Sequence, residues 1–318
     1  MIPAIQHRLD RFRQQQRVRA GSLITTVFGD AVLPRGGRIW LGSLIQLLEP
    51  LGLSERLVRT SVFRLAKEQW LRADAHGRRA DYVLTAAGQL RFEEASRHIY
   101  ASHAPLWDRR WRLILVVGEL SPREREHLRQ ALAWQGFGSL GGDCFVHPST
   151  GLETVFDALA AEGLQGLLGS LLPLLAADSR TARSASDADL VERAWNLDRL
   201  AEAYAGFVAE YQPILAELRH HRSARIEPQE AFLLRVLLIH DYRRLLLRDP
   251  GLPEVLLPTG WSGQAARLSC RELYRRLEEP SEWHLDAVMR LADGSVPAAQ
   301  ADGFERFPVD DPLSVLPL

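Results

Sequence analysis

Cations with a regular spacing lie in the segment from Glu55 to Gln69. If this segment is a helix, with 100° per residue, one side carries Arg56, Arg59, Thr60, Phe63, Arg64 and Lys67. The opposite side carries the apolar residues Val58, Val62 and Leu65. Guanidinium groups can pair with guanine O6 and N7, and further cations can contact phosphates. The pattern favours a helix that reads the major groove of DNA, although a solvated surface helix can have the same pattern.

Two further guanidinium groups lie at Arg78 and Arg79, beside Gly77 in the sequence His76-Gly77-Arg78-Arg79. Residues 70–73 and 82–85 have the composition of two strands around this turn, so we expect a basic hairpin tip that contacts phosphate or the minor groove. A solvated turn is the alternative. The pattern leaves two interpretations of Phe63 open, since its ring could touch a thymine methyl or pack under the hairpin.

The elements that must position these side chains follow one another closely. Residues 40–51 place leucines at helical spacing and are stopped by Pro50 and Gly52. Ser54 is a suitable N-cap for the next helix, which begins after a short turn. Two helices followed by a hairpin predict a winged helix-turn-helix, with a DNA-binding domain at residues 21–90.

Charge is unevenly distributed along the 318 residues, although the net charge is only -1. Residues 1–91 contain 15 Arg and Lys but 7 Asp and Glu, so a basic front part precedes an acidic remainder. Clustered positive charge suits a phosphate-binding surface. Residues 1–20 are rich in Arg and Gln, and we expect a basic N-terminal arm there, mobile or a frayed helix.

The remainder of the chain predicts an α+β multidomain protein. A linker helix is expected at residues 91–105, followed by an α+β domain at 106–178 with strands at 112–117 and 143–147 and a helix at 122–135. Residues 179–189, rich in Ser, Ala and Asp, form the best linker candidate. Long amphipathic patterns then predict a mainly helical domain at 190–318.

Composition excludes several classes. Cys144 and Cys270 are the two cysteines and form no CxxC pair, so neither a disulfide framework nor a zinc ribbon is expected. The longest apolar stretches are interrupted by Gly and Pro and stay short of the ~20 residues that span a bilayer. The N-terminus has no apolar signal core. We expect a cytoplasmic protein with no membrane partner.

Patterns typical of enzymes are weak. Residues 136–141 match GxGxxG, but they follow a helix and precede a strand, whereas a dinucleotide fingerprint does the reverse. A nuclease would need carboxylates placed for a metal, and Asp108 and Glu119 flank the first central strand from different sides. His240 and Asp241 are adjacent on a helix and point about 100° apart, which disfavours a shared metal. We therefore expect no catalytic residue, metal or cofactor.

Several short segments along the chain form a recognisable set. They are 22–30 (SLITTVFGD), 33–37 (LPRGG), 57–65 (LVRTSVFRL), 134–138 (WQGFG) with His147-Pro148, 240–244 (HDYRR), 248–250 (RDP), Leu252-Pro253, Leu257-Pro258 and Trp261. These segments closely resemble the PaaX family of phenylacetate-catabolism repressors. The resemblance covers nearly the whole chain in order. The resemblance implies a repressor that binds double-stranded operator DNA and is released from it by phenylacetyl-coenzyme A (phenylacetyl-CoA). It also implies a central ferredoxin-like domain similar to CRISPR adaptation nucleases and a helical C-terminal domain.

The segments that carry the resemblance include candidate residues for binding the effector. A coenzyme A ester carries phosphates, which arginine forks bind well, so Arg243, Arg248 and Trp261 are candidates for an effector site. Pairing with the acidic body is the other role open to these arginines. We expect a homodimer, because two-fold symmetry doubles the base contacts. The alternatives are a metal-dependent nucleic-acid-processing enzyme and a regulator that responds to a different acyl-CoA.

Overall fold

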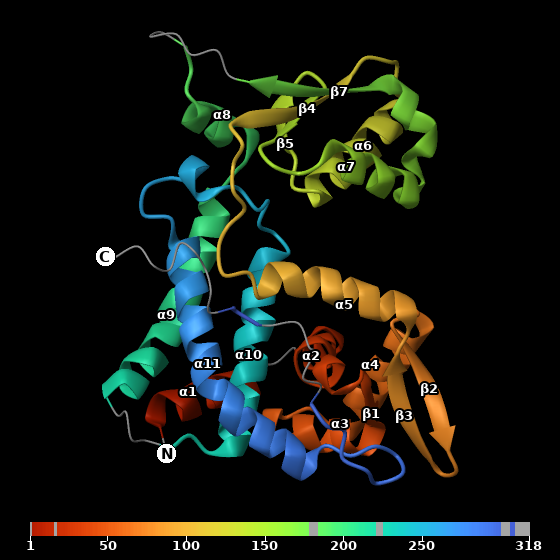
Figure 1. The fold of residues 1–318 in the computed structure, drawn as a ribbon, viewed down its shortest axis with the longest axis vertical. Coiled ribbons are helices and arrows are strands. Elements are labelled where there is room, and N and C mark those ends of the chain that lie inside the picture. Colours follow the sequence, from red (N-terminus) through yellow and green to blue (C-terminus); the bar gives the residue numbers. More distant parts are fainter. Residues whose placement is uncertain (1, 16–17, 178–183, 221–224, 300–305, 309–318) are drawn as a thin grey trace. The chain divides into compact units, whose positions relative to one another are not determined.

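The computed structural model describes residues 2–15, 18–177, 184–220, 225–299 and 306–308 (Figure 1). The chain forms two compact units. The first contains Met1–Ser102, Ala205–Arg244 and Gln264–Leu318, and the second contains His103–Tyr204 and Leu245–Gly263. The α+β multidomain class is therefore confirmed. Residues from the expected helical domain at 190–318 occur in both units.

The N-terminal segment forms a helix with a buried face, so of the two forms expected for residues 1–20, a mobile arm or a frayed helix, its first part is helical. Helix α1 (Pro3–Arg13) begins with Pro in its first turn and buries Ile5, Leu9 and Phe12, which lie at helical spacing. Arg8 is also buried, with its Nη2 2.6 Å from Asp241 Oδ2 and its Nε 3.2 Å from Glu210 Oε1. The high arginine content of this segment does not predict its buried face, because the carboxylates that pair with Arg8 are distant in sequence.

The predicted DNA-binding region contains three helices and a small sheet. Helix α2 (Ala20–Val27) continues through the π turn η1 (Phe28–Val32) and the 3-10 turn η2 (Leu33–Arg35). The elements that follow are β1 (Arg38–Trp40), α3 (Leu41–Leu48), η3 (Glu49–Leu51), α4 (Glu55–Lys67), β2 (Leu71–His76), β3 (Arg79–Leu84) and α5 (Ala86–Ile99). The strands are antiparallel in the order β1-β3-β2. Figure 1 shows β2 and β3 extending as a hairpin beside α4.

Long helices complete the first unit. They are residues 205–220 of α9 (Asp198–His220), nearly all of α10 (Pro228–Leu246) and most of α11 (Ser262–Val288). Helix α10 is buried almost all round, from Ala231 to His240 without interruption. A helix that is apolar on every side belongs in a core. Figure 1 shows α10 and α11 running alongside each other in this unit.

The second unit is built on a four-stranded antiparallel sheet in the order β5-β6-β4-β7. Its elements are β4 (Arg110–Val116), α6 (Pro122–Trp134), β5 (Gly138–Gly141), β6 (Cys144–His147), α7 (Leu152–Leu159), η4 (Ala160–Leu164), η5 (Gln165–Ser170), β7 (Leu171–Ala177), α8 (Asp187–Ala194) and η6 (Glu254–Leu256). Ser121 caps α6 and, with Glu124, completes a capping box. Residue 178 and the first part of the expected linker, residues 179–183, lie outside the described residues.

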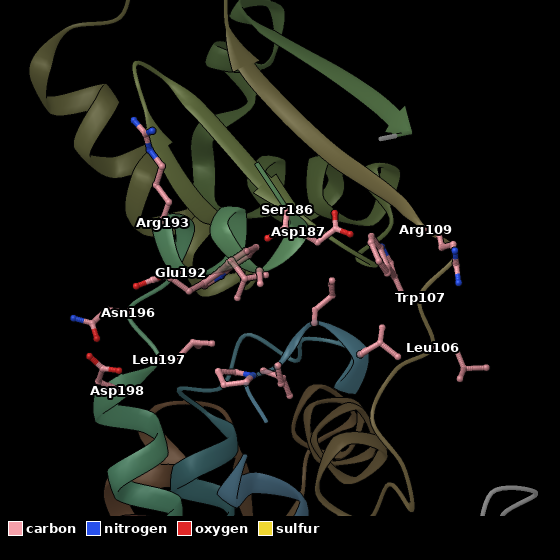
Figure 2. Close-up of a pocket in the computed structure, with 17 residues that line it drawn as sticks. Leu106, Trp107, Arg109, Ser186, Asp187, Glu192, Arg193, Asn196, Leu197 and Asp198 are labelled. Carbon is pink, nitrogen blue, oxygen red and sulfur yellow. The ribbon is translucent and has the colours of Figure 1, made fainter. Parts of the chain in front are cut away.

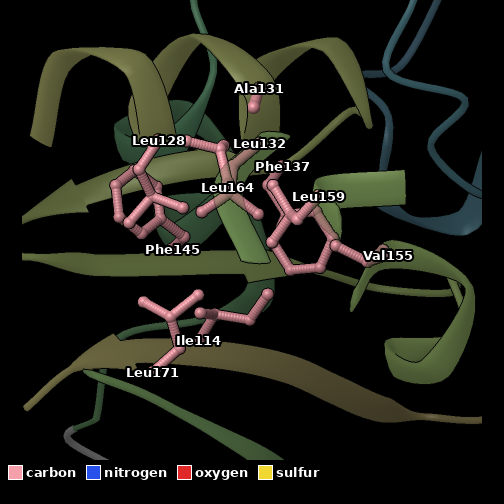
Figure 3. Close-up of a cluster of buried hydrophobic side chains, with 10 residues drawn as sticks. All are labelled: Ile114, Leu128, Ala131, Leu132, Phe137, Phe145, Val155, Leu159, Leu164 and Leu171. Atoms are coloured by element: carbon pink, nitrogen blue, oxygen red, sulfur yellow. The ribbon is translucent and has the colours of Figure 1, made fainter. Parts of the chain in front are cut away.

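One face of this sheet is covered by α6 and α7. Ile114 of β4 and Phe145 of β6 meet Leu128 and Leu132 of α6 and Val155 of α7 in a cluster of buried side chains (Figure 3). A second buried cluster contains Trp111, Val146 and Val191 of α8. The alternation of residues along β4 between these two clusters explains why its sequence reads as a nearly continuous apolar run.

Candidate functional site

Helix α4 separates an apolar face from a cationic face, as its sequence predicts. The side-chain oxygen of Ser54 accepts a hydrogen bond from the N–H of Leu57 at 3.4 Å, which caps the helix. Val58, Val62 and Leu65 are buried. After the last turn, Gln69 adopts a left-handed conformation (φ 62°), and the chain turns into the hairpin. The buried stripe thus fixes the rotation of the helix and determines which side chains face solvent.

All six side chains of the predicted cationic face are exposed. They are Arg56, Arg59, Thr60, Phe63, Arg64 and Lys67. Arg59 pairs with Glu55 at 2.7 Å and Arg64 with Glu68 at 3.7 Å, both across one helical turn. Exposed pairs of this kind contribute little, about 0.3–0.5 kcal/mol, so a phosphate or base can replace the carboxylate at small cost. The face is therefore available to an anionic partner.

Two features of this face bear on the sequence interpretation. The Phe63 side chain is 69% exposed, so it does not pack under the hairpin. A Cβ atom on Gly21 of α2 would lie 2.3 Å from Nη2 of Arg64, which shows that this guanidinium lies over the α2 backbone. The lack of a side chain at Gly21 leaves room for Arg64, a role that its place in the sequence does not reveal.

The hairpin presents its two arginines differently. Both are exposed, and the turn between them and β2 contains Gly77 at φ 60°. The Arg79 guanidinium lies 4.7 Å from the ring centroid of Trp40, and its Nη1 donates a long hydrogen bond (3.5 Å) to the carbonyl of Ala292. Arg78 has no such contact among the described residues. Arg78 is therefore the free cation of the tip, and Arg79 is held by its own unit.

A buried polar centre in the same unit escapes the sequence analysis. Asp30 of η1 receives Nε of Arg235 (α10) at 2.7 Å and the hydroxyls of Tyr100 and Tyr274 at 2.6 and 3.0 Å. Burial alone would raise the pKa of Asp30, but the guanidinium groups of Arg235 and Arg306 and the two hydroxyls outweigh burial and lower it. An aspartate in an apolar run and an arginine in another were the available signals.

The three predicted effector residues belong to different units. Arg243 belongs to the first unit, where its Nη2 donates to the hydroxyl of Ser22 at 2.8 Å and to the Ser22 carbonyl at 3.1 Å. Burial lowers its pKa. Arg248 and Trp261 belong to the second unit; Arg248 is exposed, and Trp261 packs edge-on against Tyr204 at 5.8 Å. The Arg243 guanidinium thus connects α10 to α2 within the first unit.

The larger pocket of the second unit has a volume of about 1140 Å³ (Figure 2). Trp107, Val191 and Trp195 contribute to its walls, as do residues 255–258. Its charged groups are Arg109, Arg193, Asp187, Glu192 and Asp198, so carboxylates outnumber cations. Trp111, whose Nε1 donates to Asp187 at 3.1 Å, links the aromatic rings of Trp107 and Trp195.

Comparisons with known proteins now bear on these surfaces. The family model for PaaX-like proteins matches residues 19–88, that for the PaaX central Cas2-like domain matches 104–184, and that for the PaaX-like C-terminal domain matches 195–287. The Transcriptional repressor PaaX of Escherichia coli (strain K12) is 37% identical over 293 residues, which are 91% of this chain and 90% of that protein. The chain belongs to the PaaX family.

Membership of the PaaX family confirms the resemblance seen in the sequence motifs and favours a regulator over an enzyme. A solved structure, the uncharacterized protein Rv0674 from Mycobacterium tuberculosis, is similar in fold, with a TM-score of 0.51 and 21% identity. The match covers 81% of this chain and 98% of that one. At this identity the likeness concerns the fold alone.

The features expected of a metal enzyme are weak in this PaaX-family chain. Within the described ranges, no group of three or more His, Cys, Asp and Glu side chains is placed to hold a metal ion. Asp108, a carboxylate weighed for a nuclease, is engaged by Arg112 through two contacts of 2.7 and 2.9 Å, and this pairing lowers its pKa. No described helix is long and apolar enough to cross a bilayer.

Proposed function

We propose that this chain is a DNA-binding transcriptional repressor of phenylacetate catabolism whose residues 21–90 form a winged helix-turn-helix. The observation that carries the proposal is the division of α4 into a buried apolar face and an exposed cationic face beside the β2–β3 hairpin. In this arrangement α3 supports α4, α4 enters the major groove, and Arg78 at the hairpin tip reaches phosphate or the minor groove. The similarity to the Transcriptional repressor PaaX of E. coli supports the same function.

The exposed Phe63 fits a thymine contact in this arrangement. Apolar side chains on a recognition helix distinguish thymine by its C5-methyl group. Replacing single thymines in the operator by deoxyuridine removes that methyl and keeps the base pairing. One such replacement should weaken binding of the wild-type chain but not of Phe63→Ala. Equal losses for both proteins, or no loss at any position, would remove Phe63 from base reading.

The rest of the chain supplies the proposed regulation. The strand order β5-β6-β4-β7, with α6 and α7 on one face, supports a ferredoxin-like assignment for residues 106–178. Two copies related by two-fold symmetry would place two α4 helices in successive major grooves. Phenylacetyl-CoA would then release the operator by binding more tightly to the conformer that does not bind DNA.

A gel shift with DNA from upstream of the gene tests the proposal. The four conditions are no ligand, phenylacetyl-CoA, free phenylacetate and free coenzyme A. Specific binding that only the thioester releases supports both the repressor and its effector. Specific binding that none of the three alters keeps the repressor and rejects the effector, whereas another acyl-CoA that releases the DNA changes the ligand. Metal-dependent loss of intact DNA would favour the nucleic-acid-processing enzyme.

Sedimentation tests the homodimer separately. The free protein and its complex with a single operator should sediment with two protein chains. A monomer in both states would contradict the symmetric arrangement without touching the assignment of α4.

A further inference from the structure

A second, smaller pocket of the second unit gathers segments that carry the family resemblance. Its volume is about 500 Å³, within the range of small-molecule sites. It is lined by residues from three stretches of chain, at 133–139, 194–200 and 247–250, together with Arg129, Gln130 and Phe145. The stretch WQGFG and the stretch RDP, far apart in sequence, thus meet at one hollow.

Close backbone packing makes one wall of this pocket rigid. Nε1 of Trp195 donates to the Gly136 carbonyl at 2.9 Å, and His147 Nε2 lies 3.1 Å from the carbonyl oxygen of Pro250. Gly136 has φ 85°, and a Cβ atom there would lie 2.8 Å from the Pro250 oxygen. A Cβ atom on Gly138 would lie 2.7 Å from Trp195. The wall is therefore formed before any ligand arrives, which reduces the ordering cost of binding.

Large apolar side chains are left in water at the rim. Trp134 at the end of α6 is 71% exposed, and Leu247 directly after α10 is 54% exposed. Phe137 and Phe145 also line the pocket and are buried. A ring or acyl group that enters the hollow would cover the rim side chains, and a tryptophan face also stacks on flat rings.

A cation stands beside this apolar surface. Arg248 is exposed, and no described residue pairs with its guanidinium. The other arginine, Arg129, is exposed but makes a bidentate pair with Glu126, at 2.9 Å from its Nε and 2.7 Å from its Nη2, so an anion that binds there has to break this pair. The neighbouring Asp249 carboxylate already accepts hydrogen bonds from the Tyr204 hydroxyl and the Gly251 N–H. Arg248 is thus the group of this pocket that is ready to bind an anion.

We propose that this smaller pocket binds an amphipathic anion, with the anionic group at Arg248 and the flat or apolar group against Trp134 and Leu247. This inference rests on the proposed function, because it gives the location at which the acyl-CoA effector binds. The larger pocket suits a polyanion less well, since its three carboxylates exceed its two arginines. The effector phosphates supply the anion and its acyl or adenine group supplies the apolar part.

Isothermal titration calorimetry on the full chain tests the site, with phenylacetyl-CoA, free coenzyme A and phenylacetate as probes. The variants are Arg248→Ala and Trp134→Ala in the smaller pocket, Arg123→Ala as the control for an exposed arginine of α6 that does not line the pocket, and Arg193→Ala in the larger pocket. Thermal denaturation checks that each variant folds. Because charge-assisted hydrogen bonds are strong, Arg248→Ala should weaken thioester binding about 10-fold or more, and Trp134→Ala about 5-fold. Arg123→Ala and Arg193→Ala should change it less than about 2-fold.

The outcomes separate this inference from the proposed function. If the wild-type chain binds the thioester and the Arg248 and Trp134 variants bind it equally well, the pocket assignment is wrong and the repressor with its effector stands. Loss of binding in Arg193→Ala alone would move the ligand to the larger pocket. If the wild-type chain binds none of the probes, both the proposed effector and this site are wrong.

Discussion

The arginines of α4 and the arginines of the helical core have the same side chain in opposite surroundings. The side chains of Arg59 and Arg64 are 56% and 63% exposed, and their carboxylate partners lie one turn away on the same helix. Arg235 is 1% exposed, and its partners Asp30 and Glu282 come from other elements. Arginine count therefore does not locate a nucleic-acid surface; exposure and the origin of the partner do.

Energetics explain the difference. A guanidinium removed from water is tolerated only when carboxylates and further hydrogen bonds satisfy it, so its partners cannot leave without a large loss. An exposed guanidinium paired across one turn loses little when its partner changes. The core arginines are committed to the fold, whereas those of α4 can exchange a carboxylate for a phosphate.

The largest expected effect is on folding. Arg235→Met should lower the free energy of unfolding by about 3–5 kcal/mol, because Asp30 stays buried without its main partner. Arg59→Met, which breaks an exposed pair, is the matched control and should cost less than about 0.5 kcal/mol. Urea denaturation followed by circular dichroism measures both variants. Equal losses would abolish the distinction between committed and available arginines.

The sequence predicts the local structure well, in particular the positions of helices. The helix expected at residues 55–69 is α4 at Glu55–Lys67, with Val58, Val62 and Leu65 buried as its periodicity requires. The helix expected at 122–135 is α6 at Pro122–Trp134. Spacing and capping residues determine such elements within a few positions of the chain, so no distant contact is needed to predict them.

The sequence does not reveal which residues pair when they lie far apart along the chain. Asp30 and Arg235 meet across 205 positions, and Arg8 meets Asp241 across 233. The amphipathic pattern that begins at residue 190 is divided into α8 and α9 by residues 195–197, where Nε1 of Trp195 donates a hydrogen bond to the Gly136 carbonyl. Periodicity carries no information about such partners. The convergence of residues 134–138 with 247–250 at one pocket is hidden for the same reason.

A buried base without a carboxylate partner sharpens the comparison. Burial, with Arg112 nearby, lowers the pKa of His147 from 6.5 to about 4, although the Pro250 carbonyl opposes the shift. Two amide N–H groups, of Ser149 and Thr150, donate to its Nδ1, which requires the neutral ring with the proton on Nε2. Unlike Arg235, which is buried as a charged and paired group, His147 is buried in its neutral form.

The pH dependence follows from this shift. Below pH 6.5 His147 binds a proton in the unfolded chain, but in the folded chain it does so only near pH 4. The free energy of unfolding therefore decreases as the pH falls from 6.5 to 4, by about 3 kcal/mol in total. Above pH 6.5 this histidine contributes no slope. Urea denaturation at pH 7, 6 and 5 should show a steeper loss for the wild-type chain than for His147→Gln. Parallel pH profiles would contradict a neutral buried ring.

On the exposed side, the expected loss is in DNA affinity and not in folding. Arg56→Ala combined with Arg59→Ala should weaken specific operator binding about 100-fold or more, because each bidentate base contact contributes about 1–3 kcal/mol. The matched control is Arg123→Ala combined with Arg129→Ala on α6, which also removes two exposed arginines, one of them paired within its helix. Fluorescence anisotropy at fixed salt measures affinity. A loss of similar size in the control would mean that the charge, and not the position on α4, decides binding.

The smallest effect concerns Lys67, the single lysine of the chain, in the last turn of α4. It is exposed and has no ion pair among the described side chains, so on DNA it would meet a phosphate instead of a base edge. Lys67→Ala should weaken binding to specific and non-specific DNA alike and reduce the slope of log K against log salt by about 0.9, the release of one counterion. Arg123→Ala should leave the slope unchanged. Since Lys67 carries the one side-chain amine, acetylation read by mass spectrometry reports on it directly: operator DNA should protect it, and undiminished acetylation in the complex would place the end of α4 away from the phosphates.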